Sequence, residues 1–418
     1  MMTEKPTIPE ITRRRVLFVD DDTNVLDGYR RLFRQQRDHW EMTFCDSGSE
    51  ALEKLQEEPF DVLVTDMQMP GMNGAELMSR AVDVAPGVAR IVLTGYASMS
   101  SSVEAADLAH QLLNKPCDID TLKEAIEHSC NVQSIITSDR VRQAIGRISR
   151  LPSPPTVYHE LSRALRQDDS DAATVTAIIE QDMAIAAKLL HLVNSAFFGL
   201  RRRVASLEQA VTLLGLRQIR DVVLASHVFG SDIKASPGGE LSLEKIRDHS
   251  VAVARLAREI MLEEGDGREL ADQAFIGGLL HSFGILVLAH NGFQKYDKAI
   301  DYCRRKERSL PEVERVLFGA THAEAGAYIL GLWKIPPVIV EAVLMHQTPS
   351  QLVSAKWGPV TAVHVANTLV HELRDEAKLY PVQPLDMDYL QQLGLVERVE
   401  RWREVAQEQF DELEPPPS

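Results

Sequence analysis

Cysteine is scarce in this chain: its 418 residues include only Cys45, Cys117, Cys130 and Cys303, with no Cys-x-x-Cys pair. This spacing argues against a disulfide framework and against a thiolate zinc site. The chain also has no apolar run near the roughly 20 residues needed to cross a bilayer, and its first residues lack the apolar segment of a secretory signal. We therefore expect a cytoplasmic protein with no membrane partner.

Positive charge is also in short supply, since 45 Lys and Arg residues stand against 61 Asp and Glu residues, for a formal net charge of -16. Non-specific nucleic-acid binding depends on cations that neutralise phosphates. No nucleic acid is therefore expected, and a protein is the favoured partner. A DNA-binding regulator is the least favoured class, because no clear helix-turn-helix is visible.

The notable basic cluster is Arg201–Arg203 together with Arg217 and Arg220. We interpret it as a solvated loop and helix face. A site for an anionic ligand, such as a nucleotide phosphate or an acidic partner helix, is the alternative.

The length of the chain predicts two or three domains. In its first part, short apolar runs alternate with amphipathic segments. The predicted strands are Val16–Val19, Met42–Phe44, Val62–Val64, Ile91–Leu93 and Gln111–Leu113, and the predicted helices are 24–35, 49–57, 74–84, 98–106 and 119–128. Ser47 and Asn73 are expected N-caps of two of these helices. The alternation predicts an α/β doubly wound, five-stranded parallel sheet.

Functional side chains fall at the ends of these strands. The first strand is followed by Asp20 and Asp21, and the third is followed by Asp66. Such acids share one crevice in a parallel sheet and repel one another unless a cation such as Mg²⁺ is bound. The fourth and fifth runs lead to Thr94 and Lys115, a hydroxyl donor and an ammonium suited to phosphoryl oxygens. The pattern predicts that Asp66 accepts a phosphoryl group.

Residues 15–130 resemble the flavodoxin-like receiver domain of two-component response regulators. The resemblance implies that a sensor histidine kinase phosphorylates Asp66, and that Thr94 and Lys115 contact the phosphoryl group. It also implies a set of magnesium ligands, namely Asp20, Asp21, Asp66 and the backbone carbonyl of Gln68. The sequence departs from the family at Leu112, where many receivers have a switch aromatic. Pro116, after Lys115, is a candidate for a cis peptide bond.

The second half reads as all-helical, and four of its histidines suggest a buried cluster: His249, His281, His322 and His346. Any one of them is more often a hydrogen-bonded core residue than a ligand. Together they resemble the HD superfamily of metal phosphohydrolases, but its carboxylates are missing. The His-Asp pair is His281-Ser282, and the late aspartate is Asn367.

Upstream segments narrow the resemblance. The runs Leu151–Thr156, Ile179–Asp182, Leu190–Gly199 and Ala210–Gly215 are similar to those of the HDOD domain, a non-catalytic relative of the HD hydrolases. The resemblance implies an output domain that relays a signal by protein contact, with no metal or cofactor of its own and no enzyme activity. A receiver-controlled, metal-dependent phosphodiesterase acting on cyclic dinucleotides is the alternative.

The expected organisation is a mobile tail at 1–14, a receiver at 15–130, a connecting helix at 131–150 that continues the last receiver helix, an HDOD domain at 140–345, further helices at 346–412 and a disordered tail at 413–418. Residues 346–412 are either an extension of the output domain or an interaction appendage. The sequence leaves open the identity of the kinase and of the downstream signalling protein. It also leaves open the effect of phosphorylation and the formation of a homodimer.

Overall fold

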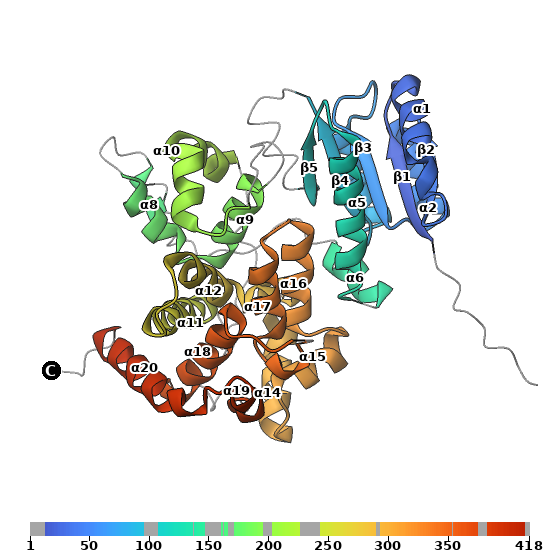
Figure 1. Cartoon of the computed structure of the whole chain (residues 1–418). Coiled ribbons are helices and arrows are strands. Elements are labelled where there is room, and N and C mark those ends of the chain that lie inside the picture. Colours follow the sequence, from blue (N-terminus) through green and yellow to red (C-terminus); the bar gives the residue numbers. More distant parts are fainter. Residues whose placement is uncertain are drawn as a thin grey trace, which may run out of the picture.

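The computed structural model describes residues 13–95, 108–136, 138–146, 160–161, 163–165, 171–194, 203–225, 243–289, 293–352, 354–374 and 383–413. Several expectations lie outside these residues: most of the two tails, the helix at 98–106, the Leu151–Thr156 motif and the end of the Leu190–Gly199 motif. The described residues form an α/β part and a helical part that lie side by side (Figure 1).

The α/β part is built on a five-stranded parallel sheet with the strand order β2-β1-β3-β4-β5. The strands are β1 (Arg14–Val19), β2 (Trp40–Cys45), β3 (Val62–Asp66), β4 (Ala89–Thr94) and β5 (Gln111–Asn114). Strands β3 and β4 are buried along their whole length, which explains why they read as apolar runs. The doubly wound fold class is confirmed. Because β1 and β3 are neighbours, the residues that follow them meet at one edge of the sheet.

The surrounding helices are α1 (Thr23–Leu32), α2 (Gly48–Glu57), α3 (Gly74–Val84) and α5 (Ile119–Gln133). Two of them, α2 and α3, begin at their predicted N-caps, Ser47 and Asn73. The Ser47 side chain accepts a hydrogen bond from the backbone of Glu50, and Asn73 does the same for Glu76. A Cβ atom at Gly74 would lie 2.2 Å from the carbonyl oxygen of Asp66. Glycine there lets α3 begin directly against the end of β3.

The expected continuous connecting helix is wrong. Helix α5 ends at Gln133, and a separate helix α6 (Asp139–Gly146) follows. The Ser134 hydroxyl donates to the carbonyl of Asn131 at 2.6 Å, an alternative to helix continuation. Arg142 on α6 donates to the carbonyls of Gln133 and Ile136, which ties the two helices together across the break.

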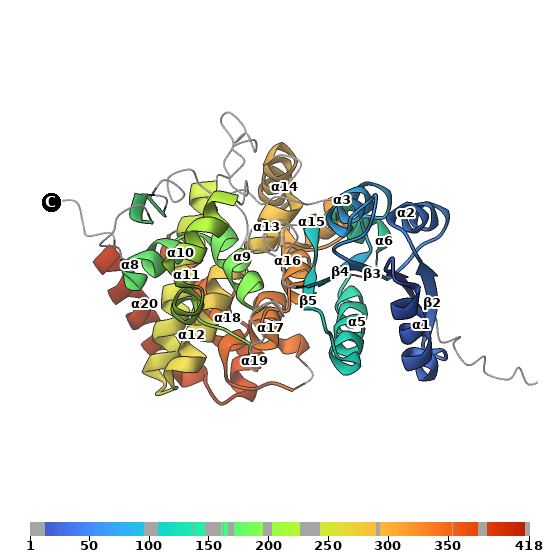
Figure 2. The same ribbon diagram turned by 90° about the horizontal axis from the view of Figure 1, so that it is seen from above.

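The helices of the second part lie beside the sheet and its helices (Figure 2). One buried hydrophobic cluster spans both parts, and a second lies wholly within the helical part. Its helices up to residue 345 are α8 (Ala172–Ile179), α9 (Met183–Val193), α10 (Leu207–Ala225), α11 (Leu243–Glu263), α12 (Arg268–Leu280), α13 (Phe283–Leu288), α14 (Phe293–Lys306), α15 (Leu310–Phe318), α16 (His322–Leu332) and α17 (Pro337–Met345). Among the described residues, the segment Arg268–Leu288 is long and apolar enough to cross a membrane, but 83% of its most apolar window is buried, as in a core helix.

The last helices belong to the same core as the rest of the helical part. They are α18 (Pro359–Leu373), α19 (Met387–Gln392) and α20 (Val399–Leu413). Trp402 on α20 is fully buried, stacks on Trp357 and donates to Glu264, the residue after α11, at 2.8 Å. Of the two readings of residues 346–412, these contacts support a continuation of the output fold.

Candidate functional site

Asp20 and Asp66 meet at the carboxyl edge of the sheet, with Lys115 between them. The Lys115 Nζ atom lies 2.8 Å from Asp20 Oδ2 and 2.7 Å from Asp66 Oδ1. Both carboxylates are buried, with 2% and 7% of each residue exposed. Burial alone would lower the pKa of Lys115, but its hydrogen bonds to Asp20 and Asp66 outweigh burial and raise it. The lysine therefore stays a cation.

The remaining predicted residues surround this pair. Asp21 is exposed and, with Gln68, lines an open cleft of about 620 Å³ beside Asp66. The backbone amide of Gln68 donates to Asp66 Oδ2 at 3.2 Å. Thr94 is buried at the end of β4, and its hydroxyl donates to the carbonyl of Gly95. The peptide bond between Lys115 and Pro116 is cis.

The donor set at this edge suits a hard divalent cation. Asp21 lines the open cleft, and the carboxylates of Asp20 and Asp66 meet at Lys115 on the same edge of the sheet. Oxygen ligands with room for water are what Mg²⁺ prefers. One lysine does not offset the charge of three nearby acids, so a bound cation would relieve their repulsion. The residues present therefore fit magnesium.

A second cluster lies in the helical part, where a pocket of about 40 Å³ is lined by His249, His281, His322 and His346. All four residues are less than a tenth exposed. The ring centres of His281 and His322 lie 5.0 and 5.6 Å from that of His346. The four predicted histidines, from α11, α16 and the ends of α12 and α17, therefore share one site.

The hydrogen bonds of these rings identify their tautomers. The Nδ1 atom faces the carbonyl of Gly278 in His281 and that of Val343 in His346. A carbonyl only accepts, so each Nδ1 carries the proton and each Nε2 a lone pair. Burial, reinforced by neighbouring imidazoles, holds the pKa of His281 and His346 well below the ordinary value. Both rings are therefore neutral. The buried Nε2 of His346 has no hydrogen-bond partner in the described part of the chain.

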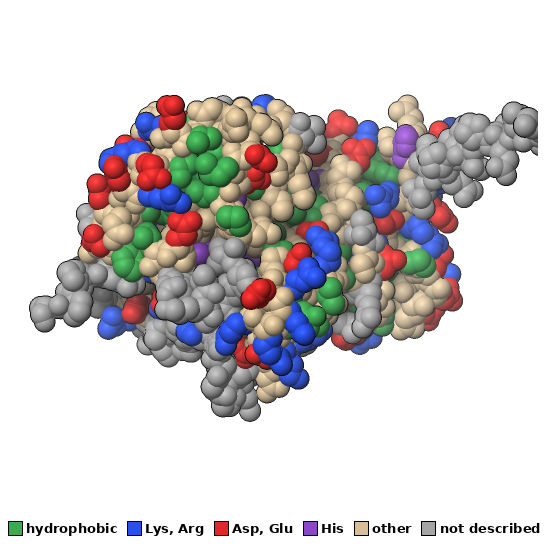
Figure 3. All heavy atoms as spheres, turned by 90° about the horizontal axis from the view of Figure 1, so that it is seen from below, with side chains coloured by type: hydrophobic (Ala, Val, Ile, Leu, Met, Phe, Trp, Pro, Cys, Tyr) green, Lys and Arg blue, Asp and Glu red, His purple; other side chains and the backbone are tan. Residues whose placement is uncertain are grey.

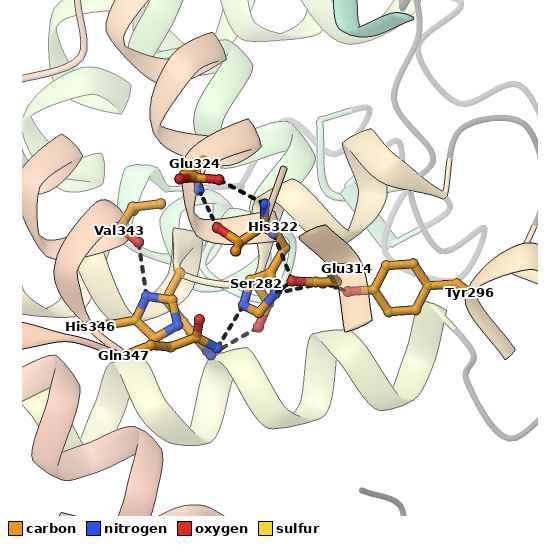
Figure 4. Close-up of polar contacts among 10 residues, drawn as sticks. Ser282, Tyr296, Glu314, His322, Glu324, Val343, His346 and Gln347 are labelled. Carbon is orange, nitrogen blue, oxygen red and sulfur yellow. Dashed lines mark hydrogen bonds and ion pairs between the residues drawn. The ribbon is translucent and has the colours of Figure 1, made fainter. Parts of the chain in front are cut away.

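Sequence reasoning missed a carboxylate at this site. Glu314 on α15 is fully buried and accepts from Nδ1 and the backbone amide of His322 (Figure 4). The Tyr296 hydroxyl donates to the same carboxylate. Glu314 lies four residues after Leu310 on α15, and this helical spacing, which places it on the buried face of the helix, was the available signal. The site is therefore less depleted of acids than its histidine motif indicates.

The pocket is completed from beyond the four histidines. His364, Asn367 and His371 on α18 line it as well, and Asn367 Oδ1 lies 3.0 Å from His249 Nε2. Within the described residues, no group of three or more His, Cys, Asp or Glu side chains has the arrangement of a metal site. The rings are thus close to one another without converging on one point.

Arg203 is the member of the basic cluster whose side chain the structure describes. Arg203 is half-buried, and burial lowers its pKa; Arg201, Arg202 and the side chains of Arg217 and Arg220 lie outside the described residues. Figure 3 shows basic side chains gathered over α14, whose last turn carries Arg304, Arg305 and Lys306. Cations in the last turn of a helix complement its dipole, so this group has a structural explanation.

A parallel sheet with buried acids and a lysine at its carboxyl edge, joined to a helical domain, defines a receiver coupled to an output domain. The family model of the response regulator receiver domain matches residues 16–127, and that of the HDOD domain matches residues 151–349. The chain belongs to the two-component response regulators, with an N-terminal receiver domain and a C-terminal HDOD domain.

Known proteins resemble parts of the chain. The response regulator receiver protein CpdR of Brucella abortus is 33% identical over 117 residues, which are 27% of this chain and 94% of CpdR. An uncharacterized protein of Treponema pallidum is 26% identical over 55% of this chain and 44% of its own length. The transcriptional regulatory protein ZraR of Escherichia coli is 25% identical over 60% of this chain and 58% of its own. The chain thus spans about half of these last two relatives.

Among solved structures, the MmoQ response regulator from Methylococcus capsulatus is 22% identical with a TM-score of 0.47, over 61% of this chain and 98% of that one. A CheY-like receiver domain protein from Methanospirillum hungatei is 31% identical with a TM-score of 0.28, over 29% of this chain and 98% of that one.

Proposed function

We propose that Asp66 accepts a phosphoryl group from a sensor histidine kinase. The observation that carries this proposal is the contact of the Lys115 ammonium with both Asp66 and Asp20, which places a cation where phosphoryl oxygens would arrive. An oxygen of Asp66 forms a bond to phosphorus while the bond from phosphorus to the histidine nitrogen breaks. The electron pair of that bond stays with the imidazole.

The remaining residues of the edge assist this transfer. Asp20, Asp21, Asp66 and the backbone carbonyl of Gln68 would hold Mg²⁺, which supplies positive charge against the phosphoryl oxygens. Lys115 orients the transferred group, and the Thr94 hydroxyl donates to it once it turns from the carbonyl of Gly95. On this proposal the receiver spans residues 15–130.

The output is a protein contact made by the HDOD domain, without catalysis, in the cytoplasm. Support comes from Ser282 and Gln347, which stand beside His281 and His346 where the HD hydrolases have a carboxylate and an imidazole. The proposed partner is a downstream signalling protein, and the alternative partner is a second copy of the chain in a homodimer. Phosphorylation changes the docking of the HDOD domain on the receiver.

The phosphoacceptor is tested by labelling the full-length protein with a small phosphodonor in the presence of Mg²⁺. Asp66→Asn is expected to abolish labelling, because an amide cannot act as the nucleophile. Asp83→Asn, at an exposed position on α3, is the matched control and should label like the unmodified protein. Undiminished labelling of Asp66→Asn would refute the assignment.

The second candidate is a metal-dependent phosphodiesterase acting on cyclic dinucleotides. Neutral rings with lone pairs on Nε2 and protons held on Nδ1 by acceptors are the form that metal-ligating histidines take. The arrangement of the described side chains and the missing His-Asp pair speak against it. Metal content of the full-length protein, grown with manganese and iron, separates the two functions. Stoichiometric metal that is lost in His346→Ala, together with hydrolysis of a cyclic dinucleotide, would favour the enzyme.

A further inference from the structure

The receiver and the HDOD domain touch through α5 and α16. The ring of His128 on α5 lies 2.8 Å from the carbonyl of Gly331 on α16. A Cβ atom on Gly331 would lie 3.0 Å from the side chain of Val132, one turn further along α5. The two helices therefore approach closely only because residue 331 is glycine.

A cation is enclosed beside this contact. Arg90 at the start of β4 is 4% exposed, and Tyr328 on α16 is 2% exposed. Burial lowers the pKa of Arg90 to about 10, against an opposing effect of nearby Tyr328. Arg90 belongs to the receiver and Tyr328 to the HDOD domain. Ala89 and Ile91, which flank Arg90 on β4, share one buried hydrophobic cluster with Tyr328, so docking of the two domains helps to remove water from this part of the receiver.

The hydrogen bonds of Arg90 are incomplete. Its Nε donates to the carbonyl of Leu108 at 2.6 Å. One terminal nitrogen, Nη1, is buried without a hydrogen-bond partner, and no carboxylate within the described part of the chain pairs with this side chain. A buried charge in this condition opposes the arrangement that encloses it.

The one other neighbour, His110, cannot supply what is missing. Its Nδ1 lies 3.0 Å from the backbone amide of Arg90, and its Nε2 lies 3.2 Å from Nη2 of the same residue. Burial, and next the Arg90 cation, hold the pKa of His110 well below its ordinary value, so the ring is neutral. A neutral imidazole has one lone pair, and it therefore accepts from only one of the two Arg90 groups.

Two more cations sit at the same contact. Burial lowers the pKa of Arg203 and of Lys334, and the carboxylate of Glu124 on α5 opposes this effect at both. Arg203 and Lys334 therefore also lose water near His128 of α5, and Glu124 favours the charged form of both. Close packing of α5 against α16 at Gly331 favours the contact, and the burial of cationic side chains disfavours it.

We propose that Arg90 is a release element of the receiver–HDOD interface. Docking encloses its guanidinium with one carbonyl acceptor and no carboxylate, whereas separation of the domains returns it to water. Arg90 therefore makes the free energy of docking less favourable. A change at the carboxyl edge of the sheet can then shift the population of the docked state. The link to signalling rests on the proposed function, but the docking equilibrium exists without phosphorylation.

Amide hydrogen exchange in α5 and α16 of the unphosphorylated, full-length protein tests this proposal. Arg90→Met keeps the volume and removes the charge, and it is expected to slow exchange in both helices by about tenfold, the scale of one unsatisfied buried group. Arg80→Met is the matched control, since Arg80 is exposed on α3 and paired with Glu76; exchange in α5 and α16 should not change. Gly331→Val, which drives a side chain into Val132, should speed exchange and marks the separated state.

Arg90→Gln is a second variant, which removes the charge but keeps a polar side chain. It should slow exchange in α5 and α16 by a smaller factor than Arg90→Met. The proposal would be overturned if exchange in α5 and α16 were unchanged or faster in Arg90→Gln and the same result were found for Arg90→Met. If Arg90→Met fails to fold, the result for Arg90→Gln decides. Labelling of Asp66 by a phosphodonor is measured on the same samples. A protein that fails to label but shows slowed exchange in the Arg90 variants refutes the proposed function and leaves the release element standing.

Discussion

The Nδ1 atom of His322 lies 2.8 Å from Oε1 of Glu314, and both residues are at most 3% exposed. The same carboxylate also accepts from the Tyr296 hydroxyl. This joins α14, α15 and α16 through one buried acid.

Glu314→Gln should therefore destabilise the HDOD domain. The amide keeps the shape but replaces an acceptor with a donor that faces other donors, at a cost of about 1–3 kcal/mol in the free energy of unfolding. Chemical denaturation measures the change, with exposed Glu397→Gln as the control, expected within about 0.5 kcal/mol. Combining Glu314→Gln with Tyr296→Phe should cost less than the sum of the two. Strict additivity would show that the network is not shared.

Stability should fall as the pH is lowered through the ordinary range of histidine. The folded-state pKa values of His281 and His346 lie well below the ordinary value of 6.5. Above 6.5 both states are neutral and the full stability is present. Below it the unfolded chain binds protons that the folded chain does not. Each such histidine then costs about 1.4 kcal/mol per pH unit. Denaturation across this range should give a shallower slope for His346→Gln, but the parental slope for His39→Gln, which alters an exposed residue.

Lys115→Met should make the receiver depend on magnesium for stability. The substitution leaves the buried carboxylates of Asp20 and Asp66 without their shared cation. Two unsatisfied buried acceptors cost about 1–3 kcal/mol in the absence of a divalent ion. Thermal unfolding with and without Mg²⁺ measures the effect, and the gain from Mg²⁺ should be larger in Lys115→Met than in the parent. An equal gain in the two proteins would mean that the lysine does not balance these acids.

The contacts of the last helix, α20, should stabilise the HDOD domain as a whole. Trp402→Ala deletes a fully buried indole that stacks on Trp357 and donates to Glu264, and it should lower the free energy of unfolding by about 3–5 kcal/mol. Met387→Ala, at a residue that is 43% exposed, should stay within about 0.5 kcal/mol. A loss of less than 1 kcal/mol for Trp402→Ala would mean that α20 is an appendage.

The receiver domain could be predicted from the sequence because the features that specify its strands and helices lie within short stretches of the chain. Strand runs of alternating units, the caps Ser47 and Asn73, and the side chains that follow each strand depend on neighbours a few residues away. In a doubly wound sheet the order of the strands then follows from chain topology. The sequence therefore predicts that Asp20, Asp66 and Lys115 lie together at one edge of the sheet.

The histidines of the helical half carried a family motif, so their common pocket was also predictable. Glu314 was not, because its role depends on α15 lying against α14 and α16, and nothing within one helix sets that packing. The break after Gln133 was missed for a related reason. It is held by Arg142, whose contacts with the carbonyls of Gln133 and Ile136 form only once α6 has folded back.

Tertiary structure alone decided how the two domains meet. His128 and Gly331 are separated by 203 positions, and an alanine-rich or glycine-rich helix has many faces on which another helix could pack. Arg90 lies one residue before the predicted strand Ile91–Leu93, and nothing in the sequence around it indicates that it is only 4% exposed. The chemistry of the acidic edge depends on residues at the ends of predictable strands. The burial of Arg90 arises only from segments that folding brings together, because burial changes the free energy of a charge and sequence distance does not.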